Sequence, residues 1–165
     1  MSPDSAPSQT TRRPGAAEDA PVSFGLLALF RAFGGYGAEL LFNLGLHPGQ
    51  ELILMQLYDR DGQTQVELQR ALGSDHSTVS RTVKRMEDRG LIARAASDRD
   101  RRAKVVMLTP RGAALQTPLR QLWAELEQRA VATIPASHLG EFTRRVNDLE
   151  RTYAAARDES ENRRE

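Results

Sequence analysis

The chain has 165 residues, contains no cysteine and carries a formal net charge of +1 at pH 7. Its length suits a single domain whose core is large enough to fold without covalent cross-links. The absence of cysteine excludes structural disulfides, thiolate metal sites and direct thiol sensing of oxidants. No apolar run approaches the roughly 18 residues of a membrane span, and the first residues lack the apolar core of a secretory signal, so we expect a cytoplasmic protein.

Both ends of the chain are predicted to be flexible tails, and residues 22–156 are predicted to form the folded domain. Residues 1–21 are rich in Pro, Ser, Ala and Thr without periodicity, and residues 157–165 are highly charged. Neither segment offers enough apolar surface to offset the conformational entropy that is lost on ordering.

The first predicted helix covers residues 22–44, which are apolar with a helical period. Gly34, Gly35 and Gly37 lie within it, and each costs up to about 1 kcal/mol relative to Ala in a helix. Tolerating that cost indicates either close helix packing or a bend.

A second predicted helix follows a break at residues 45–48. Pro48 suits its first turn, and the helix is expected to run from residue 49 to about residue 58, where a DRDG turn follows it. Its inward side is expected to carry Leu52, Met55 and Leu57.

The next two segments predict a helix-turn-helix. Thr64 is the expected N-cap of a short helix over residues 65–72, whose buried side carries Val66, Leu68 and Leu72. Gly73 ends that helix, and Asp75 is the expected cap of a helix over residues 76–89. This second helix buries an apolar stripe at helical spacing, formed by Val79, Val83 and Met86.

A β-hairpin is predicted after the helix-turn-helix. Residues 91–95 and 104–108 are expected to be strands, and residues 97–102 form the charged tip between them. Thr109 and Pro110 then begin a helix as its N-cap and first residue.

Two long amphipathic helices are predicted beyond the hairpin. Pro118 lies within the first and is expected to kink it, while Pro135 and Ala136 separate the two. Apolar residues recur at helical spacing, as Leu115, Leu119, Leu122 and Leu126 in the first and Leu139, Phe142, Val146, Leu149 and Tyr153 in the second. We expect a second copy of the chain to bury the apolar faces that remain.

These elements predict a mainly α fold of the α+β class. Residues 48–109 form a winged helix-turn-helix lobe, and residues 22–45 and 110–156 form long N- and C-terminal dimerisation helices. The prediction is therefore a homodimer with one such lobe in each subunit.

The basic residues are concentrated in one segment of the chain. Residues 76–104 contain nine Lys or Arg and four Asp or Glu, a local charge of +5 that leaves −4 for the remainder. A basic patch on an otherwise acidic molecule directs a polyanion to one face. The alternative is that this charge run is an ordinary solvated surface.

The second helix of the helix-turn-helix has a polar face opposite its buried stripe. Short hydroxyl side chains let a helix approach a major groove closely, and Arg81 and Lys84 suit either a guanine edge or a phosphate. Thr64 and Gln65, at the start of the preceding helix, suit a phosphate contact. The alternative is that the polar face is only the exposed side of a core helix.

The hairpin tip carries arginines that suit a narrow, electronegative minor groove. Arg99, Arg101 and Arg102 flank Asp100, whose carboxylate is suited to fixing the direction of one guanidinium. The alternative for Asp98 and Asp100 is plain turn chemistry.

Two strings of residues resemble the MarR (multiple antibiotic resistance regulator) family of bacterial transcription factors. They are HSTVSRTVKRMEDRGLIAR over residues 76–94 and DRRAKVVMLTPRG over residues 100–112, and the resemblance spans roughly residues 22–155. It implies a homodimer joined through terminal helices that binds a palindromic operator, usually as a repressor released by a small phenolic ligand or an oxidant. Oxidant sensing in this family relies on a cysteine that this chain lacks.

The resemblance also implies roles for individual residues. Arg102 corresponds to the wing-tip residue, and Asp100 corresponds to the acid that orients it. The residues implied at the major groove are His76, Ser77, Thr78, Ser80, Arg81 and Lys84.

An effector site is expected near the dimerisation helices. The resemblance implies that the first helix, the second helix and the start of the fifth contribute to it, and the polar or aromatic candidates there are Tyr36, Phe42, His47 and Arg111. Tyr36 and Phe42 equally suit a core, and His47 suits a helix start. No metal or cofactor is expected, because the only histidines, His47, His76 and His138, lack close ligand spacing.

Two other functional classes remain as alternatives. A winged helix reused as a protein-interaction scaffold would have no operator. An enzyme is disfavoured, because the sequence contains no glycine-rich phosphate loop, nucleophile motif or metal cluster. The operator, the effector and the choice between repression and activation are left open.

Overall fold

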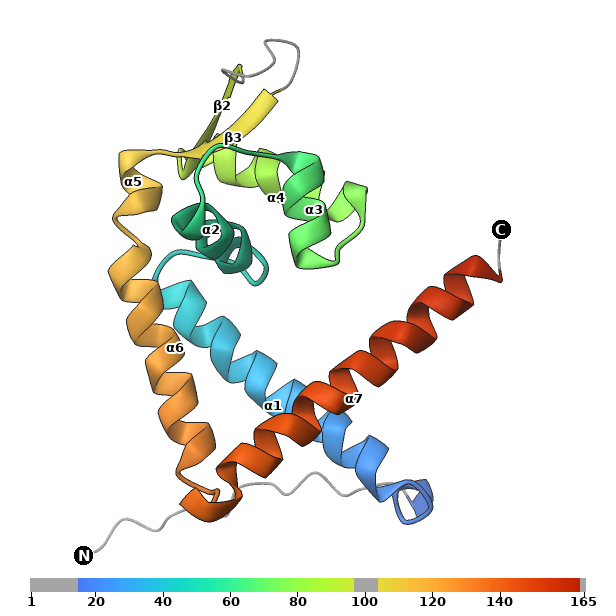
Figure 1. Ribbon diagram of the computed structural model, residues 1–165. Coiled ribbons are helices and arrows are strands. Elements are labelled where there is room, and N and C mark those ends of the chain that lie inside the picture. Colours follow the sequence, from blue (N-terminus) through green and yellow to red (C-terminus); the bar gives the residue numbers. More distant parts are fainter. Residues whose placement is uncertain (1–14, 97–103, 164–165) are drawn as a thin grey trace, which may run out of the picture. The chain divides into compact units, whose positions relative to one another are not determined.

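A computed structural model describes residues 15–96 and 104–163 of the chain. The chain divides into two compact units, Met1–Pro48 and Gly49–Glu165, and each is described by itself. In Figure 1 the described part of the first unit consists of a short 3₁₀ helix, η1 (Gly15–Ala17), and the long helix α1 (Pro21–Asn43).

Helix α1 is continuous through its glycines. An ideal Cβ at Gly34 or Gly35 would meet no atom within 4 Å, so packing against the described residues does not explain these glycines. By length and composition alone, α1 is also apolar enough to cross a membrane, which the search for uninterrupted apolar runs did not indicate. Its exposed large apolar side chains are Val22, Leu27, Leu29, Phe30, Phe33 and Phe42.

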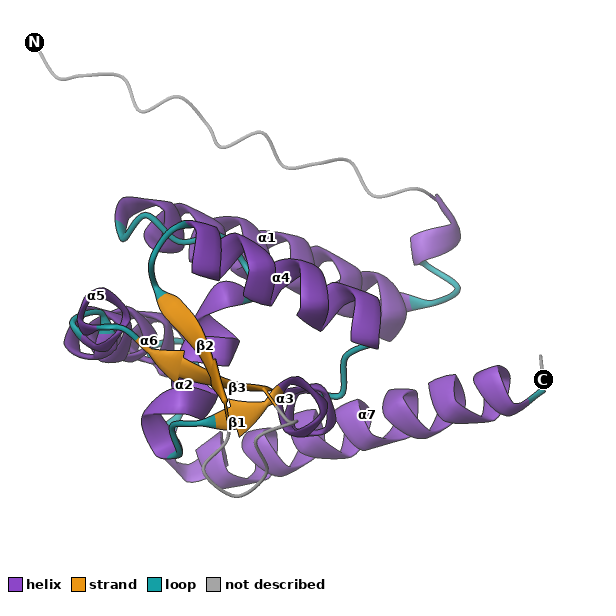
Figure 2. Ribbon diagram, turned by 90° about the horizontal axis from the view of Figure 1, so that it is seen from above, coloured by secondary structure: helices purple, strands orange, loops and turns teal. Residues whose placement is uncertain are grey.

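The described part of the second unit contains six helices and a small sheet, which Figure 2 shows as three adjoining strands. The helices are α2 (Gln50–Asp59), α3 (Gln65–Leu72), α4 (His76–Asp88), α5 (Pro110–Ala113), α6 (Gln116–Val131) and α7 (Ala136–Asn162). The strands are β1 (Gln63–Thr64), β2 (Ile92–Ala96) and β3 (Lys104–Leu108). They are antiparallel in the order β1-β3-β2. Strand β1 is too short for a period-2 pattern to reveal it in the sequence.

The expected helix-turn-helix is confirmed as α3 and α4. Thr64 and Asp75 are the N-caps, and each side chain accepts a hydrogen bond from a backbone N–H in the first turn of its helix. Gly73 ends α3 in the left-handed region, with φ of 57°, which glycine adopts without steric cost. Thr109 caps α5, with Pro110 as its first residue, as the sequence predicts.

The core of the helix-turn-helix lobe, which we define as α2 to α5, lies between the helices and the sheet. Every residue of the predicted α4 stripe is buried, and the largest fully buried side chains around it come from α2, α3, β2 and β3. They are Ile53, Leu54, Leu57, Leu68, Ile92 and Val106. This apolar contact holds α4 in one rotation about its own axis, which decides which residues face outward.

Three expected inward positions were wrong. Leu52 and Met55 on α2 and Val66 on α3 are exposed. The buried residues of α2 are Gln50, Glu51, Ile53, Leu54 and Leu57, of which only Leu57 was predicted. Pro48 was also misplaced, because it precedes the N-cap Gly49 rather than lying in the first turn.

Two expectations for the C-terminal helices also differ from the structure. Pro118 does not kink a long helix, because the chain breaks between α5 and α6 and Pro118 lies in the first turn of α6, where its missing N–H costs no hydrogen bond. Helix α7 continues past Arg157, where the sequence predicts the start of a flexible tail. The Arg157 guanidinium donates a hydrogen bond of 3.3 Å to the carbonyl of Gly73.

At Gly112 two backbone segments of the lobe approach closely. This glycine is buried in α5, and an ideal Cβ there would collide with the carbonyl oxygen of Leu91. We therefore expect Gly112→Ala to lower the free energy of unfolding by about 1–3 kcal/mol, since the clashing atom belongs to backbone that has little freedom to move.

Gly140 on α7 is the matched control, because an added Cβ meets no atom within 4 Å. Gly140→Ala should leave stability unchanged or raise it by up to about 1 kcal/mol through helix propensity. Urea unfolding of both variants measures the difference, and equal stabilities would contradict the close approach at Gly112.

Candidate nucleic-acid interface

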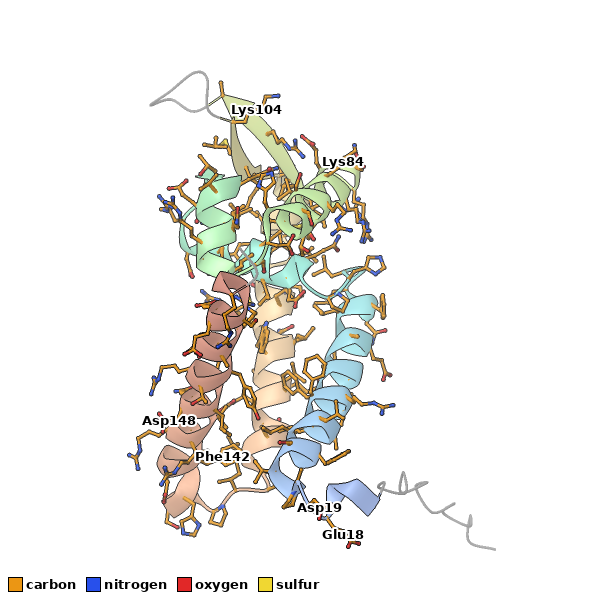
Figure 3. The ribbon with its side chains drawn as sticks, turned by 90° about the vertical axis from the view of Figure 1, so that its right-hand side faces the viewer. Glu18, Asp19, Lys84, Lys104, Phe142 and Asp148 are labelled. Carbon is orange, nitrogen blue, oxygen red and sulfur yellow. The ribbon has the colours of Figure 1, made fainter. Side chains whose placement is uncertain are left out.

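Helix α4 presents a polar, basic face opposite its buried stripe. Val79, Val83 and Met86 are each at most 2% exposed, whereas Ser80 is half-buried and the other predicted groove residues are exposed, namely His76, Ser77, Thr78, Arg81 and Lys84. Figure 3 shows Lys84 on α4 and Lys104 on β3 at the same end of the second unit. The structure therefore brings the predicted α4 residues together on one surface.

Two of these side chains, Ser77 and Arg81, form a hydrogen-bonded chain with the N-cap residue Asp75. The Asp75 carboxylate accepts from the Ser77 hydroxyl at 2.6 Å and from the backbone N–H of Thr78 at 2.9 Å. These hydrogen bonds, that from Ser77 first, hold the pKa of Asp75 well below its usual range. The cap of α4 is therefore a carboxylate throughout the neutral pH range.

The same chain reaches Arg81. Its guanidinium donates to the Ser77 hydroxyl at 3.0 Å and to the Ser77 carbonyl at 3.1 Å. A guanidinium has five donors in a planar fork, so this arrangement restrains Arg81 against α4 while leaving further donors for an acceptor outside the protein. The Ser77 hydroxyl already has a partner in both roles, because it donates to Asp75 and accepts from Arg81.

Lys84 is held less firmly than Arg81. Its ammonium lies 3.2 Å from Asp88 in an i,i+4 pair, and both side chains are more than half exposed. Exposed pairs of this kind contribute between about 0 and 1 kcal/mol. If Lys84 exchanges Asp88 for an anion outside the protein, the free energy lost with the ion pair is therefore small.

The start of α3 is closed by a reciprocal capping box. Glu67 accepts from the Thr64 N–H and from the Thr64 hydroxyl, each at 2.8 Å, and pairs with Arg60 at 2.9 Å. The backbone N–H of Thr64, followed by the Arg60 side chain, lowers the pKa of Glu67 to about 2. A carboxylate therefore already occupies the helix end where Thr64 and the half-buried Gln65 are predicted to meet a phosphate, and that contact stays a prediction.

The wing is fastened to α4 by an ion pair that the sequence did not reveal. Arg94 on β2 lies 3.3 Å from Glu87 on α4, and both side chains are largely shielded from solvent. The two residues belong to different elements on either side of the turn between helix and strand, so the period of neither element relates them. The predicted contacts Arg99, Asp100, Arg101 and Arg102 lie outside the described residues.

The four effector candidates do not form one described site. Phe42 and His47 meet edge to face, with ring centroids 5.2 Å apart, and Tyr36 lies in the same first unit. Arg111 belongs to the second unit, where it donates to the carbonyl of Arg89 at 2.9 Å, beyond the last residue of α4. Their role in effector binding stays a prediction.

The second unit contains a cavity that sequence reasoning missed. It has a volume of about 210 Å³ between α2 and α6, and Tyr58, Trp123 and Arg120 are among its lining residues. The indole N–H of Trp123 is buried without a hydrogen-bond partner among the described residues, which leaves a donor for an acceptor from outside them. In the sequence, the single tryptophan of the chain was the feature that pointed to such a cavity. Among the described residues, no three His, Asp or Glu side chains are grouped to hold a metal ion.

The capping box of α3 predicts an acid-dependent stability. Because folding lowers the pKa of Glu67 from 4.5 to about 2, its contribution to the free energy of unfolding is fully present above about pH 4.5 and is lost as the pH falls towards 2. In Glu67→Gln, urea unfolding should show a shallower loss of stability across this window than in the original chain. Glu141→Gln, at an exposed i,i+4 ion pair on α7, is the control, and an identical loss in both variants would contradict the assignment.

Comparison with known proteins agrees with this arrangement. A model of the MarR family matches residues 44–103. The chain is 27% identical over 135 residues to an HTH-type transcriptional repressor of Mycobacterium tuberculosis, an alignment that covers 82% of this chain and 97% of that protein.

Solved structures share the fold over most of the chain. A probable transcriptional regulator from Pseudomonas aeruginosa has a TM-score of 0.71 at 26% identity, covering 80% of this chain and 98% of its own. A MarR mutant from E. coli complexed with operator DNA has a TM-score of 0.72 at 22% identity, covering 83% of this chain and 99% of its own. The family match, the winged-helix fold and these relatives, which are regulators and not enzymes, identify residues 44–103 as a helix-turn-helix lobe of the MarR family of transcriptional regulators.

Proposed function

We propose that the chain is a cytoplasmic homodimeric repressor that binds a pseudo-palindromic operator through α4 and the wing. The observation that carries this proposal is the outward polar face of α4, whose rotation is held by the buried stripe beneath it. An α-helix fits the major groove, where side chains on one face reach base edges and phosphates.

The relatives support the same function by their own properties. The M. tuberculosis protein is named a transcriptional repressor, and the E. coli structure contains operator DNA. A protein-interaction scaffold remains the alternative, and its binding to duplex DNA would not respond to salt in the way that phosphate neutralisation requires.

Arg81 and Lys84 are suited to different parts of this task. Arg81 is restrained by two hydrogen bonds to Ser77, so it loses less side-chain entropy on binding and suits a guanine edge. Lys84 is held only by an exposed ion pair with Asp88 among its described contacts, and it suits a phosphate.

We predict that these two residues separate specificity from general affinity. With duplexes selected from random DNA, Arg81→Ala should weaken binding by about 1–3 kcal/mol and relax base preference at one position in each half-site. Lys84→Ala should weaken all duplexes alike and reduce the slope of log affinity against log salt by about 0.9 for each lost phosphate contact.

Arg145→Ala on α7 is the matched control, since Arg145 lies in an exposed ion pair with Glu141. Fluorescence anisotropy at several salt concentrations measures all three variants. A flat salt response of the original chain would favour the scaffold instead.

A second copy of the chain is proposed to cover the exposed apolar side chains of α7. Phe142 and Val146 are each 45% exposed and Tyr153 is 56% exposed, and they recur at helical spacing. Two-fold pairing of such faces gives two recognition helices, and half-sites about 34–36 Å apart accommodate them on one side of the duplex.

We predict that Phe142→Asp disrupts this pairing. The added carboxylate would be desolvated in the dimer, so sedimentation velocity should show a shift towards monomer, and operator affinity should fall with it. Asp148→Ala is the control, because Asp148 extends from a different side of α7 (Figure 3) and contacts Arg151. A dimer that tolerates Phe142→Asp would place the interface elsewhere.

The cavity between α2 and α6 is proposed to hold a small aromatic effector that releases the operator. Met55 and Leu119 supply apolar wall, whereas Gln116, Arg120 and the buried N–H of Trp123 supply donors. The lining also includes one acidic residue, Asp59, beside the three donors. The donors together suit an aromatic ring whose carboxylate lies towards Arg120 and Trp123.

A further inference from the structure

Tyr58 belongs both to the cavity and to the support of the recognition helix. Its side chain lines the cavity between α2 and α6. Its hydroxyl donates a hydrogen bond of 2.8 Å to the carbonyl of Gly112, which is 54 residues away in the sequence. One hydroxyl therefore connects the cavity wall to α5.

Gly112 lies against Leu91, which follows the turn at the end of α4, the proposed recognition helix. No side chain fits between Gly112 and the carbonyl of Leu91, and the N–H of Leu91 donates to Met86, in the last turn of α4, at 2.9 Å. Movement of the backbone at Gly112 therefore acts on Leu91 without an intervening side chain.

Two residues close to Gly112 in the chain donate hydrogen bonds to the turn that follows α4. Thr109 donates from its hydroxyl to the carbonyl of Gly90 at 2.7 Å, and Arg111 donates to the carbonyl of Arg89 at 2.9 Å. We call Thr109, Arg111 and Gly112 the α5 clamp. The clamp supplies donors to the carbonyls of Arg89 and Gly90, in the turn just beyond α4.

The chemistry of Tyr58 suits it to exchange partners. Burial raises the pKa of Tyr58 to about 12, so the hydroxyl remains a donor over the whole physiological range. A carboxylate in the cavity is a stronger acceptor than the carbonyl of Gly112. It can therefore draw the hydroxyl away from the α5 clamp, while Trp123 and Arg120 supply further donors to the same anion.

We propose that Tyr58 is the positioning residue that couples occupancy of the cavity to the recognition helix. With the cavity empty, Tyr58 holds Gly112 and the α5 clamp against the end of α4. With an aromatic carboxylate bound, the hydroxyl turns to the ligand and the clamp loosens. This proposal rests on the proposed function, and linkage requires that DNA binding in turn disfavours the ligand.

The coupling can be measured both at the cavity and at the DNA, and Trp123 fluorescence provides the signal at the cavity. It is the only tryptophan in the chain and lines the cavity, so its fluorescence reports on that site alone. The selected operator duplex, labelled for anisotropy, reports DNA binding separately. Benzoate serves as the probe for the cavity.

In the original chain, the duplex should change the Trp123 emission, and saturating benzoate should weaken duplex binding by about 5- to 150-fold. In Tyr58→Phe, the duplex should still bind and benzoate should still alter Trp123 emission, but neither ligand should affect the other. Thr109→Val, which removes a clamp contact outside the cavity, should also reduce the coupling. Thr152→Val, the same change as in Thr109→Val but at an exposed position on α7, should retain it.

The outcomes separate the two proposals. Absence of duplex binding by the original chain would overturn the proposed function. Duplex binding without any change in Trp123 emission, or with no effect of saturating benzoate, would overturn the coupling and leave DNA binding standing. Full coupling in a folded Tyr58→Phe variant would overturn the role of Tyr58.

Discussion

The burial of the apolar stripe of α4 is the interaction on which the rest of the lobe depends. Val79, Val83 and Met86 are buried against α2, the sheet and α3, and this burial decides the rotation of the helix. Each of these side chains contributes roughly 1.5–3 kcal/mol when fully buried, far more than any exposed ion pair on the opposite face. The apolar stripe therefore sets the direction in which the polar residues point, and the polar residues do not set it themselves.

The polar face is ordered by contacts that are easily exchanged. Asp75, Ser77 and Arg81 satisfy one another along the first turns of α4, and Lys84 is balanced by Asp88. These contacts are mostly exposed, so each contributes little to stability but restricts side-chain rotation before a ligand arrives. At the other end of the helix the α5 clamp and the Arg94–Glu87 pair join α4 to α5 and β2. The recognition helix is thus fixed at its core and adjustable at its termini.

Particular residues show where sequence reasoning succeeded and where it failed. The stripe of α4, the caps Thr64, Asp75 and Thr109, and strand β3 were all predicted, because each depends on local periodicity or on a side chain bonding its own helix end. On α2, Leu57 was predicted correctly but Leu52 and Met55 were wrong, because several apolar residues surround that helix and its period alone does not choose among them. Pro118 was misread because a helix break a few residues earlier converts a kink position into a first-turn position.

The sequence by itself therefore determined the helix-turn-helix, the wing strands, the family and the polar face of α4, since these are properties of short segments. Only the tertiary structure decided which residues support that face. The Tyr58–Gly112 hydrogen bond, the Gly112–Leu91 approach and the cavity beside Trp123 join residues far apart in the chain. No spacing rule relates such residues, because their meeting follows from how complete helices pack and not from the period of any one of them.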